Sequence, residues 1–238
     1  MGNAVKESGA PRACVVVPAF TEERRIGQVV EQIRRHVPLV IVVDDGSADG
    51  TATEAEDAGA IVLKHERNEG KGVALQTGFR RAMQEECEVV ITMDADGQHN
   101  PEDIPKFLEA YQRTGIPVLL GNRMTHLEEM PRIRRWTNRV MSLIISRVMR
   151  QYVPDTQCGF RLFRRDVIPF LNVESHRFAA ESEMLLHLAD RGFRIDSVRV
   201  TVIYRDEQSK IHPVSDAVRF FHMLYHYRHK RHGYYGFT

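Results

Sequence analysis

Short apolar runs alternate with longer amphipathic segments over the first half of the chain. Each apolar run is rich in β-branched residues and stops at polar, glycine or proline residues, which is typical of buried strands. The segments between them space their apolar residues as one face of a helix does, as Val73, Phe79 and Met83 illustrate. The pattern predicts strands over residues 14–18, 39–43, 60–63, 88–93 and 118–121, and helices over 22–35, 49–57, 70–85 and 101–113.

This alternation indicates an α/β fold with a mostly parallel sheet and helices on both faces. A chain of 238 residues accommodates one such domain with appendages. The regular alternation ends after Arg123. Beyond it we expect a helix over 132–150, a strand near Phe160, a helix over 179–191, a strand over 194–204 and a helix over 214–228. The predicted organisation is a disordered segment over 1–12, one domain over 13–212, and an amphipathic helix with a basic tail over 213–238.

Charge and cysteine content give no sign of a nucleic-acid-binding protein or of a disulfide-rich secreted one. The 33 Lys and Arg residues nearly balance 32 Asp and Glu residues, so nothing in the overall charge points to nucleic acid. Cys14, Cys87 and Cys158 are widely spaced and form no Cys-x-x-Cys or Cys/His pair, which favours a reducing, cytoplasmic location. The N-terminus carries no apolar secretion signal, and no run of about 18 apolar residues predicts a membrane span.

Two predicted strands end in acidic turns, at Asp44-Asp45-Gly46-Ser47 and at residues 94–98, Asp-Ala-Asp-Gly-Gln. Ligands of open α/β sheets bind beyond the carboxyl ends of the strands. Asp94 and Asp96 are two residues apart, so on an extended backbone their side chains point the same way, and Gln98 continues that row. Carboxylate and amide oxygens suit Mg²⁺ or Mn²⁺ with positions left for phosphate oxygens. The alternative is ordinary turn and capping chemistry.

Other nucleotide and metal motifs fail on spacing. An EF-hand beginning at Asp94 requires glycine where His99 stands and glutamate where Pro105 stands. The stretch Gly70-Lys71-Gly72 lacks the third glycine of a dinucleotide fingerprint, and no Walker sequence is present. Nucleotide phosphates therefore need another means of binding.

Five motifs, in their order along the chain, resemble the family 2 glycosyltransferases of the GT-A fold. Within that family, Asp94-Ala95-Asp96-Gly97-Gln98-His99 and the run from Asp155 to Arg161 are most similar to the dolichyl-phosphate mannose synthase and polyprenyl-phosphate glycosyltransferase group. The similarity covers roughly residues 13–212. The five motifs are Val17-Pro18-Ala19-Phe20-Thr21-Glu22-Glu23, Val43-Asp44-Asp45-Gly46-Ser47, Asn68-Glu69-Gly70-Lys71-Gly72, the 94–99 run and Gly121-Asn122-Arg123.

The resemblance implies a Rossmann-like GT-A domain that binds a nucleotide diphosphate sugar, either GDP-mannose or a UDP-hexose. Thr21 stands where the family usually has asparagine, which leaves the hydrogen bonding at the end of the first strand open. The roles implied are Pro18, Phe20, Glu22 and Asp45 near the nucleoside, Lys71 near the base or diphosphate, Ala95 at the donor, and Asp94, Asp96 and Gln98 on Mg²⁺ or Mn²⁺.

The acceptor decides which further residues the reaction needs. A phosphate monoester, with a second pKa of about 6, is already ionised near neutrality, so it needs cations and no general base. The polyprenyl-phosphate group places basic and hydroxyl residues where this chain has Arg123, Arg134, Arg205, Ser209 and Lys210. Taken singly, each arginine also fits an ordinary surface charge.

A hydroxyl acceptor would instead require a base, for which Glu183 and Asp155 are the candidates. Glu183, with Glu181 two residues before it, opens a predicted helix, so helix-dipole complementation is the alternative explanation. Together with Asp96 and Arg123, these two carboxylates complete the predicted catalytic set.

Residues 140–149 and the stripe of Val218, Phe221, Leu224 and Tyr225 combine apolar residues with basic neighbours, which favours peripheral contact with the cytoplasmic membrane face. Ordinary core-facing helices have the same pattern. The preferred hypothesis is an inverting, metal-dependent hexosyltransferase that acts on a polyprenyl or dolichyl phosphate. A hydroxyl acceptor, a nucleotidyltransferase and a non-catalytic nucleotide-sugar binding module remain alternatives, and the sequence fixes no oligomeric state.

Overall fold

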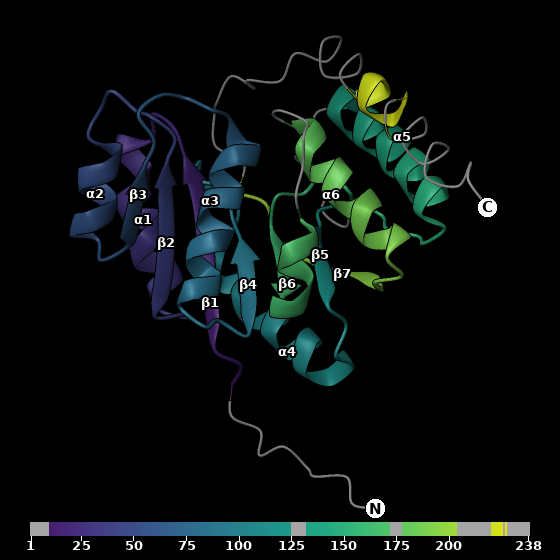
Figure 1. Cartoon of the computed structure of the whole chain (residues 1–238), viewed down its shortest axis with the longest axis horizontal. Helices are drawn as coiled ribbons and strands as arrows, with labels where there is room; N and C mark the ends of the chain where they lie inside the picture. The colour runs from purple at the N-terminus through teal and green to yellow at the C-terminus, as the bar shows by residue number, and fades with distance from the viewer. Residues whose placement is uncertain (1–9, 125–131, 172–177, 204–219, 226, 228–238) are drawn as a thin grey trace, which may run out of the picture.

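A computed structural model describes residues 10–124, 132–171, 178–203, 220–225 and 227, and Figure 1 shows it as a cartoon. The order of elements is β1 (Ala13–Ala19), α1 (Glu23–Arg34), β2 (Leu39–Asp44), α2 (Thr51–Asp57), β3 (Ile61–Lys64), α3 (Lys71–Gln84), β4 (Val89–Thr92), η1 (Pro101–Asp103), α4 (Ile104–Thr114), β5 (Val118–Asn122), α5 (Arg132–Met149), β6 (Arg161–Arg164), η2 (Arg165–Phe170), α6 (Phe178–Asp190) and β7 (Ile195–Arg199).

These strands form a seven-stranded sheet with the order β3-β2-β1-β4-β6-β5-β7. The pairs β1–β2, β1–β4, β2–β3 and β5–β7 are parallel, whereas β6 lies antiparallel to both β4 and β5. The predicted α/β class and mostly parallel sheet are confirmed. The sequence interpretation placed a strand near Phe160 but did not identify its position between β4 and β5 or its reversed direction.

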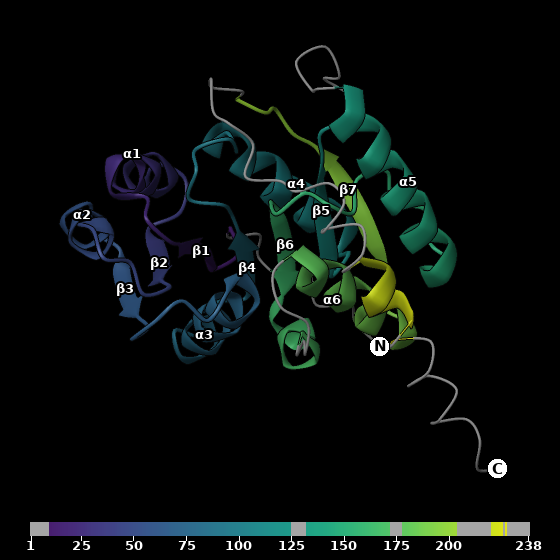
Figure 2. The same cartoon turned by 90° about the horizontal axis from the view of Figure 1, so that it is seen from above.

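Helices cover both faces of the sheet, with α1 and α4 on one side and α3 and α6 on the other (Figure 2). The alternation of side chains along β1 explains the two layers, because Val15 and Val17 belong to the α1 side of the core while Cys14 and Val16 belong to the α3 side. Gly78 allows α3 to approach β1 closely, since a Cβ there would lie 2.3 Å from Cγ1 of Val16.

The predicted strand over 194–204 is shorter in the structure. β7 follows β5 only as far as Arg199, because β5 itself ends at Asn122. The chain then crosses to the 94–99 turn, where Val202 forms an isolated antiparallel bridge with His99. The backbone N–H of Ile203 donates to the carbonyl oxygen of Gln98 at 2.9 Å. This crossing segment helps to fix the acidic turn after β4.

The predicted helix over 214–228 is helical where it is described, at residues 220–225 and 227. Val218 of the predicted apolar stripe lies outside the described residues, and the other three members divide between core and surface. Phe220, Met223 and Leu224 are buried in the α3-side core, whereas Phe221 and Tyr225 are 57% and 60% exposed. Residues 1–9 of the predicted N-terminal segment lie outside the described residues. Within the described part of the chain, no helix is both long and apolar enough to cross a bilayer.

Candidate active site

Three elements bring an ammonium group between two carboxylates at the carboxyl-terminal rim of the sheet. Lys71 is the first residue of α3, Asp94 follows β4, and Glu181 lies in the first turn of α6. The Nζ atom of Lys71 lies 2.5 Å from Oδ1 of Asp94 and 3.1 Å from Oε1 of Glu181. The predicted donor residues Lys71 and Asp94 are therefore in direct contact, and Glu181 is a third member that the sequence interpretation gave no role.

This cluster holds Lys71 and Asp94 in their charged forms. Burial alone would lower the pKa of Lys71, but the Asp94 and Glu181 carboxylates raise it above its ordinary value. Burial of Asp94 opposes its ionisation, but the Lys71 ammonium outweighs that cost, so the pKa of Asp94 lies well below its usual value. Two carboxylates against one ammonium leave the cluster with a formal excess of one negative charge.

Gly159 permits the chain before β6 to pass directly over this ion pair. A Cβ at residue 159 would lie 2.7 Å from Oδ2 of Asp94 and 3.0 Å from Nζ of Lys71. The Gly159 carbonyl also accepts a hydrogen bond from the Thr92 hydroxyl at 2.8 Å, which fixes the chain before β6 against the end of β4. Any side chain here would displace the Lys71–Asp94 pair, so the glycine is a steric requirement of the site.

His99 positions the backbone of Asp94. Its Nδ1 atom accepts the Asp94 N–H at 3.2 Å, and its ring stacks on Phe160 with centroids 5.4 Å apart. Burial lowers the pKa of His99 below its usual value despite the neighbouring Asp94, so the ring is neutral near neutral pH. The sequence interpretation treated His99 only as part of a motif, and its positioning role depends on contacts with Phe160 and Val202 far along the chain.

Asp96 and Gln98, the other predicted metal ligands, occupy the same turn as Asp94. The Gln98 N–H donates to Oδ1 of Asp96 at 2.9 Å, and both side chains are partly exposed. Among the described residues, no three His, Cys, Asp or Glu side chains gather closely enough to hold a metal by themselves. The set still fits Mg²⁺ or Mn²⁺ in a nucleotide complex, because such ions take one or two carboxylates and complete their shell with phosphate oxygens and water.

Asp45 shapes the loop that leads into Lys71. Its Oδ1 accepts the Glu69 N–H at 2.9 Å and lies 2.7 Å from Nδ1 of His65, and its Oδ2 accepts the Gly70 N–H at 2.8 Å. The side chain is almost fully buried. Asp45 was predicted to lie near the nucleoside, and in the structure its carboxylate is directed into the chain's own loop. Asp45 therefore shapes the loop that carries Lys71, and its predicted place near the nucleoside stays a prediction.

The first motif forms the turn between β1 and α1. Pro18 is partly buried within β1, while the ring of Phe20 is 46% exposed at the end of this strand. The Glu22 N–H donates to Oγ1 of Thr51 at 2.9 Å, and its Oε2 lies 3.1 Å from Nη1 of Arg25. Thr21 donates its N–H to Oγ of Ser47 at 2.9 Å.

Thr21 adopts φ 58°, in the left-handed region that β-branched residues rarely enter. Asparagine enters this region much more readily. The departure from the family pattern therefore leaves the turn hydrogen-bonded through its backbone but places a strained side chain at the rim of the site.

Arg123 and Asp155 form a buried bidentate pair. The Arg123 Nε and Nη2 atoms lie 2.7 Å from Oδ2 and 3.0 Å from Oδ1 of Asp155, and the Arg123 N–H donates to the same carboxylate at 3.2 Å. Burial of Asp155 opposes its charged form, but Arg123 holds its pKa below the usual value. Asp155, a candidate base, is thus a fully buried counter-ion of a candidate phosphate-binding arginine.

Arg161, the first residue of β6, is buried without a carboxylate among its hydrogen-bond partners. Its guanidinium donates to three main-chain carbonyls, those of Cys158 at 2.8 Å, Glu181 at 2.8 Å and Thr156 at 3.0 Å. It therefore ties the loop before β6 to the first turn of α6, and holds Gly159 and Glu181 on either side of Lys71. The Asp155–Arg161 motif contained this arginine, but its carbonyl partners are not readable from sequence.

Glu183 lies two residues beyond Glu181 on α6 and is 9% exposed. Its Oε1 atom is 3.6 Å from Nε2 of His187, one turn along the helix. Of the predicted phosphate-binding residues, Arg205, Ser209 and Lys210 lie outside the described residues, as does the side chain of Arg134. Their proximity to the Lys71 cluster therefore stays a prediction.

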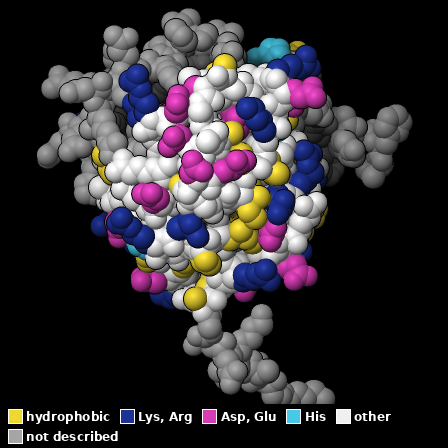
Figure 3. Space-filling model, turned by 90° about the vertical axis from the view of Figure 1, so that its left-hand side faces the viewer, with side chains coloured by type: hydrophobic (Ala, Val, Ile, Leu, Met, Phe, Trp, Pro, Cys, Tyr) yellow, Lys and Arg dark blue, Asp and Glu magenta, His cyan; other side chains and the backbone are white. Residues whose placement is uncertain are grey.

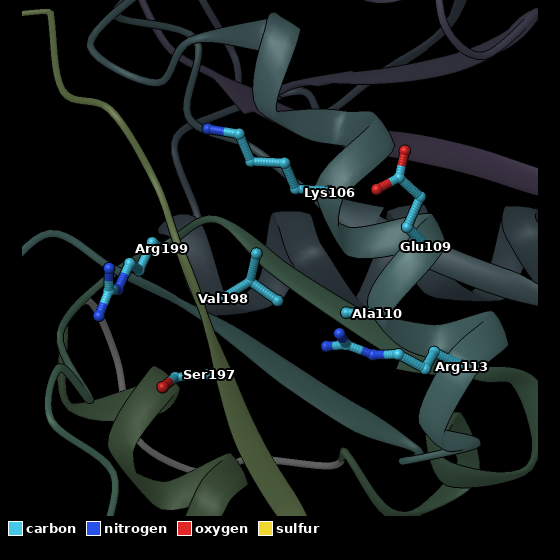
Figure 4. Close-up of a pocket in the computed structure, with 7 residues that line it drawn as sticks. All are labelled: Lys106, Glu109, Ala110, Arg113, Ser197, Val198 and Arg199. Carbon is cyan, nitrogen blue, oxygen red and sulfur yellow. The ribbon is translucent and has the colours of Figure 1, made fainter.

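One face of the molecule and one hollow lie apart from these contacts. Basic and acidic side chains are interspersed on the face shown in Figure 3, without a continuous patch of one sign. A hollow between α4 and β7 is lined by Lys106, Glu109, Ala110, Arg113 and residues 197–199 (Figure 4). None of the predicted site residues lines this hollow, so it is separate from the rim described above.

Comparisons with known proteins show which chains this protein resembles. The chain is 32% identical over 202 residues to a dolichyl-phosphate hexose transferase of Haloferax volcanii, covering 84% of this chain and 86% of that protein. It is 30% identical over 215 residues to the UDP-N-acetylglucosamine–dolichyl-phosphate N-acetylglucosaminyltransferase of Methanococcus voltae, covering 81% and 86%.

The fold is similar to that of glucosyl-3-phosphoglycerate synthase from Mycobacterium tuberculosis, solved with Mn²⁺, UDP and glucosyl-3-phosphoglycerate. The TM-score is 0.66 at 23% identity, with 83% of this chain and 73% of that chain covered. The family model described as glycosyl transferase family 2 matches residues 14–170. The chain therefore belongs to glycosyl transferase family 2.

Proposed function

We propose that this enzyme moves a hexosyl group from a nucleotide diphosphate sugar to a polyprenyl or dolichyl phosphate, with inversion at the anomeric carbon. The observation that carries the proposal is the Lys71–Asp94–Glu181 cluster beside Asp96, at the strand ends of a chain whose relatives are named for transfer to dolichyl phosphate. Family membership selects a glycosyltransferase over the nucleotidyltransferase and the binding module.

The donor would lie over the turns after β1, β2 and β4. Displacement of the nucleoside diphosphate makes the sugar ring electron-poor and places growing negative charge on the leaving group. Mg²⁺ or Mn²⁺ held by Asp94 and Asp96, with Gln98 beside them, would supply a Lewis acid for that charge. Lys71 brings a second positive charge to the same rim. Phe20, partly exposed at the end of β1, offers an apolar surface for the base.

A phosphate acceptor needs no general base, and it can bind the cationic side chains proposed at this rim. The attacking phosphate oxygen is already ionised near neutral pH, so no side chain has to remove a proton. The new bond forms between this oxygen and the anomeric carbon as the bond to the diphosphate breaks. We propose that Arg123 faces the acceptor phosphate, with Arg134, Arg205, Ser209 and Lys210 as further ligands. Asp155 orients the Arg123 guanidinium through its bidentate contact.

Transfer to a hydroxyl group is the second candidate, and it requires a base. Asp155 is a poor base because its carboxylate is fully buried against Arg123. Glu183 beside His187 is the better candidate. With a phosphate acceptor, Glu183→Gln should retain appreciable turnover, whereas complete loss in a normally folded variant would favour the hydroxyl mechanism.

We also propose peripheral membrane contact through the outer face of α5. Trp136 and Leu143, 69% and 50% exposed, lie seven residues apart on that helix, with Arg139 and Arg147 exposed on the same side. An aromatic residue and arginines beside an apolar face suit an anionic lipid surface. Flotation with vesicles containing anionic lipid should carry the protein, and Trp136→Ser with Leu143→Ser should abolish it. Flotation unchanged by both substitutions would reject this surface.

The transfer reaction itself is tested with defined donors and acceptors. Purified protein with Mn²⁺ is incubated with GDP-mannose or UDP-hexoses and with dolichyl phosphate, and free nucleoside diphosphate and glycolipid are both measured. The proposal predicts release of one diphosphate for each sugar attached to lipid. Equal turnover with dolichol, which lacks the phosphate, would contradict the acceptor assignment.

A further inference from the structure

The ammonium group of Lys71 is bound to Asp94, the carboxylate that is predicted to hold the metal ion. It lies 2.5 Å from Oδ1 of Asp94, and it is held from the other side by Oε1 of Glu181 at 3.1 Å. We propose that Lys71 is a built-in counter-cation for Asp94, which has to leave that carboxylate when the divalent ion binds and which then pairs with the donor diphosphate. This inference rests on the proposed function and assigns Lys71 a role in the order of binding.

A divalent ion on Asp94 would compete with the ammonium of Lys71 for the same carboxylate. Mg²⁺ binds a carboxylate oxygen at about 2.0–2.1 Å, so an ion on this carboxylate would lie within a few ångströms of the ammonium. The side chains of Lys71 and Asp94 are only 23% and 30% exposed, so water would screen the repulsion between the two cations only in part. Metal binding to the donor-free protein is therefore opposed by the Lys71–Asp94 contact.

Asp94 needs a counter-cation in the absence of metal because a second carboxylate lies close by. Glu181 and Asp94 both face Lys71, and without its charge two poorly solvated carboxylates would be left at close range. The hydrogen bonds of Arg161 to the Glu181 and Cys158 carbonyls fix the backbone on both sides. The backbone of Gly159 packs against the pair, since a Cβ on this residue would lie 3.0 Å from the ammonium.

Lys71 can leave Asp94 without losing all its partners. Glu181 comes from a different element, so the ammonium retains one carboxylate when Asp94 turns to a metal. Its position at the start of α3 places it next to a helix N-terminus, which also favours an anion such as a diphosphate. A diphosphate therefore gives the displaced ammonium a new partner. We infer that divalent metal and nucleotide bind cooperatively because each compensates for the charge that the other disturbs.

Calorimetric titration of the protein with MnCl₂, with and without saturating UDP, tests this inference. In the wild-type protein, UDP should strengthen Mn²⁺ binding. Lys71→Met and Lys71→Gln remove the competing charge, so without UDP both should bind Mn²⁺ more tightly, by about tenfold, and the strengthening by UDP should shrink. Lys71→Gln keeps a hydrogen-bond donor beside Asp94, which protects the test if Lys71→Met does not fold.

Two control variants separate the local effect of the Lys71 charge from the effect of changing the net charge of the protein. Lys71→Arg keeps the positive charge and should bind Mn²⁺ alone as the wild type does. Arg80→Met removes a charge from an exposed position on the same helix and should change nothing. Unchanged or weaker Mn²⁺ binding by both neutral Lys71 variants would overturn the inference while leaving the proposed function intact. Failure of the wild type to bind Mn²⁺ even with UDP would overturn the metal assignment itself and this inference with it.

Discussion

Nε of Arg123 lies 2.7 Å from Oδ2 of Asp155, so residues on opposite sides of α5 in the sequence meet as a buried ion pair. Arg123 directly follows β5, and Asp155 lies in the loop that leads to β6. The pair therefore fastens both ends of the long α5 segment to the rim of the sheet. Replacing one member of such a buried pair by a neutral residue lowers the free energy of unfolding strongly, because the remaining charge is left buried without its partner.

The stability contributed by Asp155 should depend on pH. Its folded pKa lies below the usual 3.8, so the contribution is present above that value and is lost as the pH falls through the lower, folded pKa. Asp155→Asn should lower the free energy of unfolding by about 3 kcal/mol near neutral pH. Urea unfolding at a series of pH values should show this difference shrink below about pH 4. A difference that stays constant down to about pH 3 would contradict the assignment.

Arg161 should be a major determinant of stability. Arg161→Met leaves three main-chain carbonyls without their donor, and we expect a loss of about 3–5 kcal/mol in the free energy of unfolding. The control is Arg164→Met on the same strand, which removes a partly exposed pair with Asp166 and should cost less than about 1 kcal/mol. Similar losses in the two variants would show that the carbonyl contacts contribute little.

Thr21→Asn should stabilise the protein. The residue is exposed and its backbone is left-handed at φ 58°, so asparagine relieves strain without loss of packing. The expected gain is about 1 kcal/mol in the free energy of unfolding, read from the urea midpoint. Thr53→Asn, at an exposed position inside α2, should give no gain. Equal shifts at both positions would mean that the turn is not strained.

Asp96→Ala should abolish sugar transfer and leave the fold intact. Asp96 is partly exposed, so its loss costs little stability, whereas removal of a metal carboxylate should cost several kcal/mol of transition-state stabilisation. Turnover with Mn²⁺ and circular dichroism are measured on the same preparation. Glu109→Ala, an exposed carboxylate on α4 away from the rim, is the matched control and should keep full activity. Undiminished turnover of Asp96→Ala would reject its role.

The apolar pattern predicted most of the sheet because these strands are buried on both faces. Strands such as β1 and β2 read as continuous β-branched runs, and nearly every residue in them is buried. The direction and position of β6 were not predictable in this way. Arg161–Arg164 carries arginines at both ends, and its pairing with β4 depends on residues about 70 positions earlier in the chain.

The site was predictable in part for a related reason. Asp45, Lys71, Asp94 and Asp96 stand in local motifs at strand ends, where sequence order and position in the sheet coincide. Glu181 and Gly159 join the same cluster only through tertiary folding, over separations that no local spacing encodes. The role of Asp45 near the nucleoside stays a prediction, and its carboxylate also binds the loop before Lys71, which the motif alone did not indicate.

The antiparallel strand β6 also sets an order for folding during synthesis. β5 pairs only with β6 and β7 among the described strands, so it has no direct hydrogen-bonded link to the β3-β2-β1-β4 half of the sheet. A nascent chain that has left the ribosome only as far as α5 holds β4 with one edge unpaired. The two halves join when Arg161–Arg164 emerges, and the same event brings Gly159 over Asp94. The joining of the two halves of the sheet and the placement of Gly159 over the Lys71–Asp94 pair are thus one step, and Glu181 and β7 follow later in the chain.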